Sequence, residues 1–341
     1  MDPIFIIGTE RSGTNLLRLI LNAHSHIAIP HPPHIMKNLF ALEPLYGDLS
    51  GDVRFRRLVR DVVTLVRLHA YPWEVKLDEE KILRAARERS LIGVFFSVYD
   101  HYRALVGKER WGCKSTFMIY HVARIRRLCP SAKFIYMVRD GRDVAVSARQ
   151  SIFNHYGMYD IARLWRDEQK IGISWLQTLS SRDLFLLKYE DLIGRPQETV
   201  RALCLFLNEP YEETMLEFFK GPEAQKSSRL SASWKNTSRP IMSGNKGKFK
   251  ASLSEKDIDL FEAVAGRELD YFSYRLSRPF EISAGARARG VRPGMGDSIR
   301  GFALMLSVQA RHLLTDKNIG LRIKKFWFLR SLRVRRAMTR W

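Results

Sequence analysis

A short apolar segment followed by a glycine-bounded loop limits what this 341-residue chain can fold into more than any other feature. Residues 4–7 are continuously apolar, Gly8 follows them, and Gly13 opens an amphipathic segment five residues later. This order predicts a strand, a loop and a helix. Backbone N–H groups of such a loop, together with the helix N-terminus, point toward a common anion site. The chain therefore begins with a predicted phosphate-binding element.

The residues inside this loop indicate which phosphate ligand it suits. The Gly8-x-x-x-x-Gly13 spacing is that of the nucleotide-binding P-loop, in which Lys and then Ser/Thr follow the second glycine. Thr14 and Asn15 stand at those two positions here, and Arg11 lies within the loop. Without the lysine that reaches a γ-phosphate, the loop is poorly suited to ATP and magnesium. We expect a different phosphorylated ligand.

Composition places the chain among ordinary globular proteins with anionic partners. Hydrophobic residues make up 45% of it and charged residues 27%, and the formal net charge is +21. The three dispersed cysteines indicate a reducing compartment and no metal site. A strand begins almost at residue 1, and no apolar run nears the ~18 residues of a membrane span. We therefore expect a cytoplasmic protein and favour a bacterial cytoplasm.

Alternation of short apolar segments with helical ones predicts the fold class. Residues 111–113, 133–138 and 184–187 are such apolar segments, separated by amphipathic stretches. This pattern is typical of an α/β fold, in which a P-loop-like parallel sheet is flanked by helices on both faces. Ligands bind such folds beyond the carboxyl ends of the strands, so residues that follow the strands are the site candidates. The polar residues 221–250 are expected to form an irregular loop.

A second segment, residues 133–147, repeats the strand–turn–helix order. Arg139 follows the apolar strand, where its guanidinium can bind two phosphate oxygens at once, and Ser147 follows on the helix. These two residues are candidates to hold one phosphate between them. The alternative is a structural ion pair between Arg139 and Asp140 or Asp143. Two anion sites after two strands of one sheet predict a ligand with two separated phosphates and no required metal.

Taken together, these residues resemble the sulfotransferases that use 3′-phosphoadenosine 5′-phosphosulfate (PAPS). The resemblance covers about residues 4–275 and is closest to Golgi-type and bacterial members with an Arg-Ser-Gly-Thr loop, such as the tyrosylprotein and carbohydrate sulfotransferases. The matching segments, in chain order, are Arg11-Ser-Gly-Thr14, Lys114, residues 133–147, Tyr189-Glu-Asp-Leu192 and Gly244-Asn-Lys-Gly-Lys248-Phe249.

This resemblance implies an activity and a set of binding residues. The implied reaction moves a sulfuryl group from PAPS to a hydroxyl of a carbohydrate, glycolipid or other metabolite, leaving adenosine 3′,5′-bisphosphate (PAP) without a metal. The loop would hold the 5′-phosphosulfate, while Arg139 and Ser147 would bind the 3′-phosphate. The implied cofactor contacts are Arg11, Ser12, Gly13, Thr14, Asn15, Arg139, Ser147, Tyr189 and Lys248.

Two histidines and two cations are the candidate catalytic residues. Family members place a Glu or His shortly after the first helix, as the base that accepts the acceptor's proton. This chain has no acid there and reads Pro30-His31-Pro-Pro-His34, so we expect His31 to be the base, with His34 as the alternative. Lys114 and Arg11 would neutralise charge on the transferring group. A histidine in a proline turn and a solvated lysine are the structural alternatives.

The last fifth of the chain carries most of the charge. Residues 275–341 contain 16 Lys/Arg and 3 Asp/Glu, which is +13 of the +21. We divide the chain into a sulfotransferase-like domain, 1–275, and a basic, partly helical extension, 276–341. Within the extension, residues 284–296 are expected to form a linker, and 298–314 and 323–338 to form helices.

The aromatic and basic residues interleaved in 323–338 are typical of peripheral binding to the inner face of a membrane or to an acidic glycan. A helix packed on the body and a nucleic-acid contact are the alternatives, the latter less favoured.

Two other functions fit parts of the sequence. A P-loop kinase of a small molecule requires magnesium and the absent loop lysine. A basic adaptor for nucleic acid or membrane, without enzymatic activity, would explain the extension but not the order of Arg11, Lys114, Arg139 and Ser147. A PAPS-dependent enzyme is therefore the favoured prediction, and its acceptor specificity is expected from residues 34–111 and 221–250.

Overall fold

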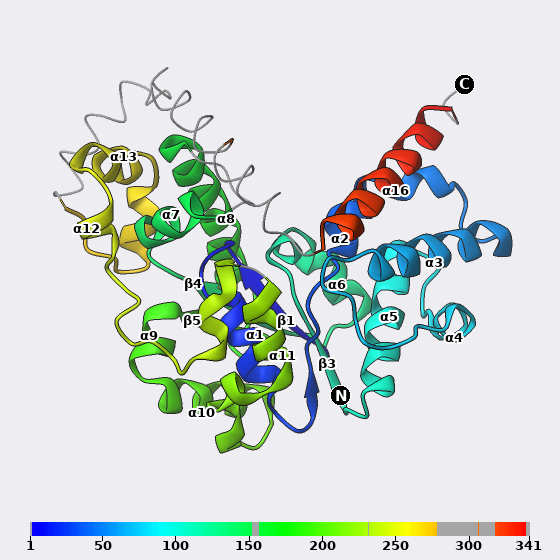
Figure 1. Ribbon diagram of the computed structural model, residues 1–341, viewed down its shortest axis with the longest axis horizontal. Helices are drawn as coiled ribbons and strands as arrows, with labels where there is room; N and C mark the ends of the chain where they lie inside the picture. The colour runs from blue at the N-terminus through cyan, green and yellow to red at the C-terminus, as the bar shows by residue number, and fades with distance from the viewer. Residues whose placement is uncertain (1, 152–156, 231, 278–305, 307–317, 339–341) are drawn as a thin grey trace.

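A five-stranded parallel sheet forms the centre of the molecule (Figure 1). The computed structural model describes residues 2–151, 157–230, 232–277, 306 and 318–338. The strands are β1 (Ile4–Gly8), β2 (Ile27–Ala28), β3 (Arg110–Lys114), β4 (Lys133–Val138) and β5 (Leu184–Lys188). Their order is β2-β3-β1-β4-β5, and every pairing is parallel. The predicted α/β class is confirmed, and β1 lies at the middle of the sheet.

Helices cover both faces of this sheet because its strands are apolar on both sides. Phe5 and Ile7 of β1 enter one hydrophobic core, and Ile4 and Ile6 enter the other. The helices are α1 (Thr14–Asn22), α2 (Ile35–Leu39), α3 (Asp52–Arg67), α4 (Glu79–Ala85), α5 (Leu91–Leu105), α6 (Val122–Leu128), α7 (Gly141–Arg149), α8 (Met158–Thr178), α9 (Tyr189–Gly194), α10 (Pro196–Leu207), α11 (Pro222–Leu230), α12 (Phe249–Ser252), α13 (Glu255–Tyr271) and α16 (Ile319–Met338).

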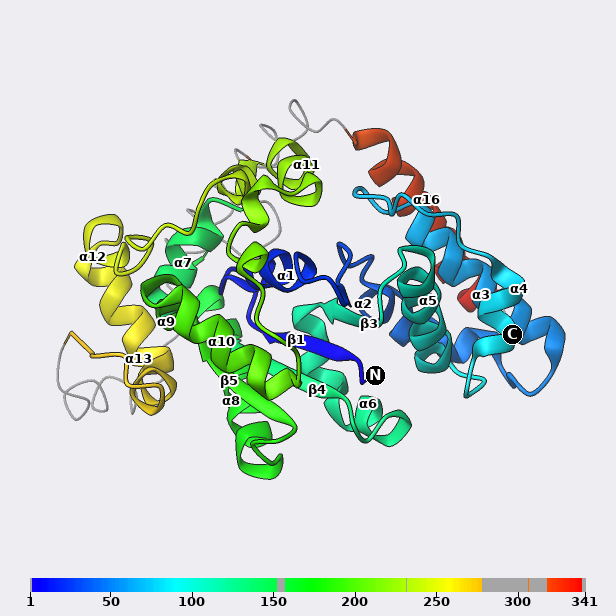
Figure 2. The same ribbon diagram turned by 90° about the horizontal axis from the view of Figure 1, so that it is seen from below.

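The two ends of the molecule carry different helices. In both views α3, α4, α5 and α16 gather at one end, while α12 and α13 lie at the other (Figure 1 and Figure 2). The carboxyl edges of β1, β3, β4 and β5 lie between these groups. The sheet therefore lies between two groups of helices that come from different parts of the chain.

One expected loop is partly helical. Residues 221–250 contain α11, α12 and a 3-10 segment, Ala232–Ser238, so the prediction of an irregular loop is wrong there. The reason is a tertiary contact: the buried Arg18 of α1 forms an ion pair with Glu223 at 2.9 Å and donates to Ser227 Oγ at 3.4 Å. A polar segment with low helical signal is thus held as a helix against α1.

The C-terminal extension is described only in part. The helix expected over 323–338 is confirmed as α16. The linker expected over 284–296 lies outside the described residues, as does the helix expected over 298–314 apart from position 306. Within the described parts of the chain, no helix combines the length and apolarity needed to cross a membrane.

Candidate active site

The glycine-bounded loop after β1 adopts backbone angles that its glycines permit. Gly8 has φ of +138°, and a Cβ there would lie 2.2 Å from the backbone oxygen of Met137 in β4. Gly13 has φ of +91°, and a Cβ there would lie 2.3 Å from the ring of Tyr189. Both positions thus require glycine for backbone angle and for space. Tyr189, predicted from sequence as a cofactor contact, therefore forms one wall of the loop.

The N-terminus of α1 is open to an anion. No side chain caps it, and its first turn has no acidic residue. Nearby, Ser12 Oγ and Asn15 Nδ2 are buried and have no hydrogen-bond partner among the described residues. Buried polar atoms are normally paired because an unmet group costs free energy. Two unpaired donors beside a free helix N-terminus mark a place that a ligand's oxygens would complete.

Arg11 connects this loop to the second predicted anion site. Its Nε donates to Ser147 Oγ at 3.0 Å, and its backbone oxygen accepts from Arg139 Nη1 at 3.2 Å. Burial lowers the pKa of Arg11 from its ordinary value, and the neighbouring charge of Arg139 lowers it further. The structure therefore brings the two predicted anion sites together around one residue.

Arg139 is buried at the end of β4 in an electron-rich setting. Its Nη2 donates to the Asn245 backbone oxygen at 3.1 Å, and its guanidinium lies 4.4 Å from the centroid of the Tyr189 ring. The distance from Nη2 to Asp143 Oδ2 is 3.8 Å, so the ion pair considered as the alternative is also present. Nε has no partner within the part of the chain described. A buried guanidinium with one free N–H can still bind an anion.

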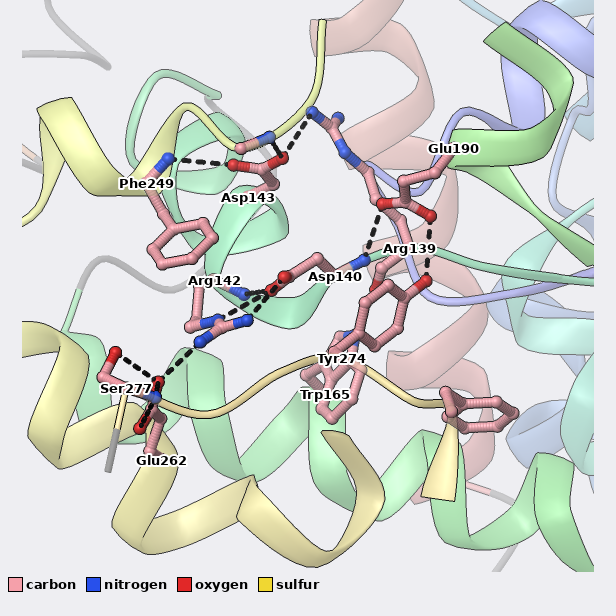
Figure 3. A network of polar contacts seen from close by, with 12 residues as sticks. Arg139, Asp140, Arg142, Asp143, Trp165, Glu190, Phe249, Glu262, Tyr274 and Ser277 are labelled. Carbon is pink, nitrogen blue, oxygen red and sulfur yellow. Dashed lines mark hydrogen bonds and ion pairs between the residues drawn. The ribbon is translucent and has the colours of Figure 1, made fainter. Parts of the chain in front are cut away.

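Asp143 holds the loop of residues 244–249 at the site by hydrogen bonds, instead of serving as a metal ligand. Its two oxygens accept from the backbone N–H groups of Gly247, at 2.6 Å, and Phe249, at 2.9 Å. This contact, visible in Figure 3, brings residues 244–249 beside Arg139. Lys248 lies in this loop with an exposed side chain that forms no hydrogen bond or ion pair with a described residue. Its predicted cofactor contact stays a prediction.

The remaining charges of the Arg-Asp-Gly-Arg-Asp segment support this arrangement. Asp140 caps α7 by accepting from the Arg142 N–H, and Arg142 forms ion pairs with Asp140 at 2.7 Å and Glu262 at 2.5 Å (Figure 3). Glu190 accepts from the Asp140 N–H and from the Tyr274 hydroxyl. Asp140 therefore serves as a helix cap and an ion-pair partner, while Glu190 holds the start of α7 and Tyr274 by hydrogen bonds.

Lys114 is a buried cation at the end of β3. Its side chain forms no hydrogen bond or ion pair with any residue that the structure describes. Burial lowers its pKa to about 8, and the charge of Arg18 also lowers it. Below that pH the side chain keeps its positive charge. An unpaired buried ammonium group one strand away from the loop is suited to neutralise an anion, and the catalytic role predicted for Lys114 stays a prediction.

The two candidate bases lie close to Lys114. His31 is buried, and neither of its ring nitrogens has a partner among the residues described. His34 Nδ1 lies 3.4 Å from Ser115 Oγ, and the residue has φ of +57°. Burial lowers both pKa values well below the ordinary value, aided most by His69 for His31 and by Lys114 for His34. Both histidines are therefore neutral at pH 7.

A third histidine, His69, was not found from the sequence. It lies just beyond α3, and its ring centroid lies 5.1 Å from that of His31 and 6.3 Å from that of His34. Its Nδ1 accepts from the Tyr71 N–H at 3.1 Å, and burial lowers its pKa to about 3. Only the tertiary fold joins it to the other two, since 35 residues or more separate them in sequence.

A cavity of about 270 Å³ begins at His31. Trp73 donates from Nε1 to the His31 backbone oxygen at 2.8 Å, and Tyr102 packs on Trp73 with centroids 4.6 Å apart. The wall is formed by Pro30, His31, Tyr71, Pro72, Trp73, Glu74, Val75, Tyr102, Val106, Glu223, Lys226 and Ser227. Apart from Pro30 and His31, these residues come from the segments 34–111 and 221–250, in which acceptor specificity was expected.

One group of three residues has the side-chain types of a metal site. His24, His26 and Glu209 place one potential ligand atom each within 4.8 Å of one another. However, His24 Nδ1 accepts from the His26 N–H, and His24 Nε2 lies 2.9 Å from the Pro210 backbone oxygen. Glu209 forms an ion pair with Arg110. These hydrogen bonds occupy both nitrogens of His24, so the group is a structural network.

Comparison with known proteins agrees with this geometry. Residues 3–213 match the family described as "Sulfotransferase family". The chain is 26% identical over 226 residues to Protein-tyrosine sulfotransferase 1 of Danio rerio, covering 63% of this chain and 56% of that protein. It is 24% identical over 253 residues to Protein-tyrosine sulfotransferase 2 of Gallus gallus, covering 71% and 61%. The matches thus span little more than half the length of these relatives.

A solved structure shares the fold. The sulfotransferase domain from the Synechococcus PCC 7002 olefin synthase aligns with 81% of this chain and 96% of that chain, with 19% sequence identity and a TM-score of 0.53. At that identity the likeness concerns the fold alone.

Proposed function

Because this chain belongs to the sulfotransferase family, we propose that it transfers a sulfuryl group from PAPS to a hydroxyl group of an acceptor. One observation carries this proposal: the guanidinium of Arg139 donates to the backbone of Arg11, inside the glycine-bounded loop. Two anion-binding groups that follow the adjacent strands β1 and β4 can therefore share one nucleotide with two separated phosphates.

Unpaired donors at the site fit such a ligand. Ser12 Oγ, Asn15 Nδ2 and Arg139 Nε are buried, and each is unpaired within the described chain. Phosphate and sulfate oxygens are strong acceptors that would satisfy them. The loop with the α1 N-terminus would hold the 5′ group, and Arg139 with Ser147 the 3′-phosphate. Tyr189 would border both groups because its ring contacts the Gly13 position and the Arg139 guanidinium.

Arg11 and Lys114 would neutralise the negative charge that develops at the reacting group. PAPS, when bound, supplies an activated sulfuryl group whose departure leaves negative charge on a phosphate oxygen. Lys114 is buried and unpaired among the described residues, so its ammonium is available to that charge without first breaking an ion pair. A fixed cation in a water-poor site stabilises developing charge more strongly than in water. This arrangement requires no magnesium ion.

The acceptor hydroxyl would lose its proton to a neutral histidine. His31 is proposed as this base because both of its nitrogens are unpaired within the described chain and its side chain borders the cavity. His34 is the alternative base. Its Nδ1 lies near Ser115 Oγ, so its Nε2 would accept the proton. The low pKa of each histidine keeps it unprotonated at neutral pH, and a bound anionic cofactor would raise that pKa toward the working range.

The cavity favours a sugar ring among the possible acceptors, whether in a carbohydrate, a glycolipid or another hydroxylated metabolite. Tyr71, Trp73 and Tyr102 supply flat apolar faces on which the C–H face of a pyranose can pack. Glu74 and Glu223 supply carboxylates that accept hydrogen bonds from hydroxyl groups. The Glu74–Lys226 and Glu223–Arg18 ion pairs hold those carboxylates in place.

A transfer assay tests this function. The protein is incubated with radiolabelled PAPS, in buffer containing EDTA, and with three acceptors: a neutral oligosaccharide, a glycolipid and a tyrosine-containing peptide. We expect labelled product with a sugar-bearing acceptor, and at least about a hundredfold slower transfer by the Arg11→Ala or Lys114→Ala variant. Transfer to the peptide alone would replace the proposed acceptor class. Failure of the protein to bind PAP would overturn the function itself.

A further inference from the structure

We propose that the outward face of α16 binds the surface of an anionic lipid bilayer. Ile323, Phe326, Trp327 and Val334 are exposed by 52%, 56%, 60% and 51%. At 100° per residue these four positions fall within one third of the helix circumference, so they form a single apolar stripe. Large exposed apolar patches on a protein mark interaction sites. The stripe lies on the face of α16 opposite to Lys325, whose charge contributes to the lowered pKa of His34.

The opposite face of α16 attaches the helix to the body. Leu332 is fully buried, and Phe328 and Leu329 pack against the larger hydrophobic core. Asn318, just before the helix, donates from Nδ2 to the Ala70 backbone oxygen at 2.7 Å. The helix contacts the 3-10 segment Phe40–Tyr46, and in Figure 1 it projects at one edge of the molecule. The helix is therefore held in place, and its apolar outer stripe is not the face used for folding.

Charge complementarity identifies the partner. Residues 319–338 contain seven Lys/Arg and no Asp/Glu. Arg330 lies within the apolar stripe, 6.0 Å from the centroid of the Trp327 ring, while Lys324 and Arg333 flank the stripe on its two sides. Lys324, Arg330 and Arg333 form no ion pair with any described residue. Long basic side chains beside an apolar stripe reach lipid phosphates while the stripe enters the acyl boundary.

The aromatic content distinguishes a membrane from a nucleic acid as the partner. Phe326 and Trp327 pack edge to face with centroids 5.6 Å apart, and together they form the middle of the stripe. Trp is favoured at the membrane–water interface, where its ring is apolar and its N–H reaches polar groups. Binding to nucleic acid depends mainly on contacts between cations and phosphates, and it needs no apolar stripe such as the one that these rings form with Ile323 and Val334.

Vesicle co-sedimentation of the full-length protein tests the proposal. The probes are phosphatidylcholine vesicles with and without phosphatidylserine. We expect binding to the phosphatidylserine vesicles that weakens as salt rises, with little binding to phosphatidylcholine alone. Phe326→Ser/Trp327→Ser should weaken the binding about tenfold or more. Arg330→Gln/Arg333→Gln should weaken it about 25-fold, from about fivefold per basic residue.

Matched controls separate this surface from general stickiness. Val53 and Leu205 are exposed by 83% and 79% on α3 and α10, so Val53→Ser/Leu205→Ser removes apolar surface elsewhere. Lys256→Gln removes an exposed charge on α13. We expect both controls to bind vesicles like the wild type, and all variants to unfold at the wild-type temperature. Vesicle binding by the α16 variants equal to that of the wild type would overturn the proposal. Binding of the wild type to heparin or DNA, but to no vesicle, would also overturn it.

Discussion

The two sides of the proposed site are built differently. On the phosphate side, Arg11 donates to Ser147 Oγ, and Arg139 donates to the backbone oxygen of Arg11. Asp143 holds residues 244–249 by accepting from the backbone N–H of Gly247. On the acceptor side, His31 has no hydrogen bond to its ring among the described residues, and its environment consists of the rings of His69, Tyr71 and Trp234.

This difference suggests that the two sides have different roles, one in nucleotide binding and the other in catalysis on the acceptor. A fixed network of donors suits a ligand whose phosphates are always the same. Ring packing without committed hydrogen bonds suits a histidine whose proton must be exchanged and an acceptor that varies in shape. Changes on the phosphate side should therefore weaken nucleotide binding, whereas changes on the acceptor side should slow turnover and leave nucleotide binding intact.

The largest expected effect is on the acceptor side. His31→Asn should lower kcat by about 10²- to 10⁴-fold, because a positioned base contributes that much to proton transfer. The affinity for PAP should stay within about twofold, since it depends on the other side. Steady-state transfer kinetics and calorimetric titration measure the two quantities. If His34→Asn lowers kcat and His31→Asn does not, His34 is the base.

Substitution of Lys114, which lies at the boundary between the two sides, tests whether this residue stabilises the charge that develops on the reacting group. Lys114→Ala should lower kcat about 10²- to 10³-fold, the usual loss when one charge-stabilising group is removed. Single-turnover assays with saturating PAPS measure the chemical step directly. A loss confined to KM, with kcat unchanged, would show that Lys114 contributes uniform binding instead.

The pH dependence should follow from groups on both sides. His31 and His34 have pKa values below the ordinary 6.5, so the base is already neutral above that pH. Lys114 loses its charge as pH rises through about 8. We therefore expect kcat/KM to be level between about 6.5 and 7, to be halved near pH 8 and to fall further at higher pH. Lys114→Arg should move the alkaline fall to higher pH, and an unmoved profile would assign it to another group.

A smaller effect tests the packing behind the phosphate side. A Cβ at Gly141 would lie 2.5 Å from the Phe261 ring and 2.7 Å from Trp165. Gly141→Ala should lower the free energy of unfolding by about 1–3 kcal/mol, as overpacking does. Gly320→Ala in α16, where a Cβ meets open space, should be neutral or stabilising by up to about 1 kcal/mol. Urea denaturation compares the two, and equal stabilities would contradict the packing described.

Sequence predicted the phosphate side better than the acceptor side, for a physical reason. A strand followed at once by a glycine-bounded loop, or by Arg139, is a local signal, because the carboxyl ends of parallel strands must lie at one edge. The hydrogen bond from Arg139 to the Arg11 backbone is a consequence of that rule. The ion pair between Arg139 and Asp143 had likewise been considered from the sequence.

The acceptor side depends on contacts between distant segments. His69 follows α3, Trp234 lies in a 3-10 segment, and only the packing of those elements places both rings against His31. The polar segment 221–250 has no clear helical pattern in its sequence. Its helix α11 is held by Arg18, which lies far away in the sequence. Such contacts leave no periodic pattern, so sequence could indicate the regions that shape the cavity but not the residues.

Titration of PAP against the wild-type protein and Arg139→Ala, in metal-free buffer, tests the central claim most directly. The account predicts tight binding that EDTA does not weaken, together with weaker binding of ATP–magnesium. Arg139→Ala should raise the Kd for PAP about 10- to 100-fold, the loss of a buried charged hydrogen-bond donor. Arg149→Ala, on the same helix as Ser147 but paired with Asp257, should bind like the wild type. A Kd unchanged by Arg139→Ala, or tighter binding of ATP–magnesium, would contradict a nucleotide shared between the two anion sites.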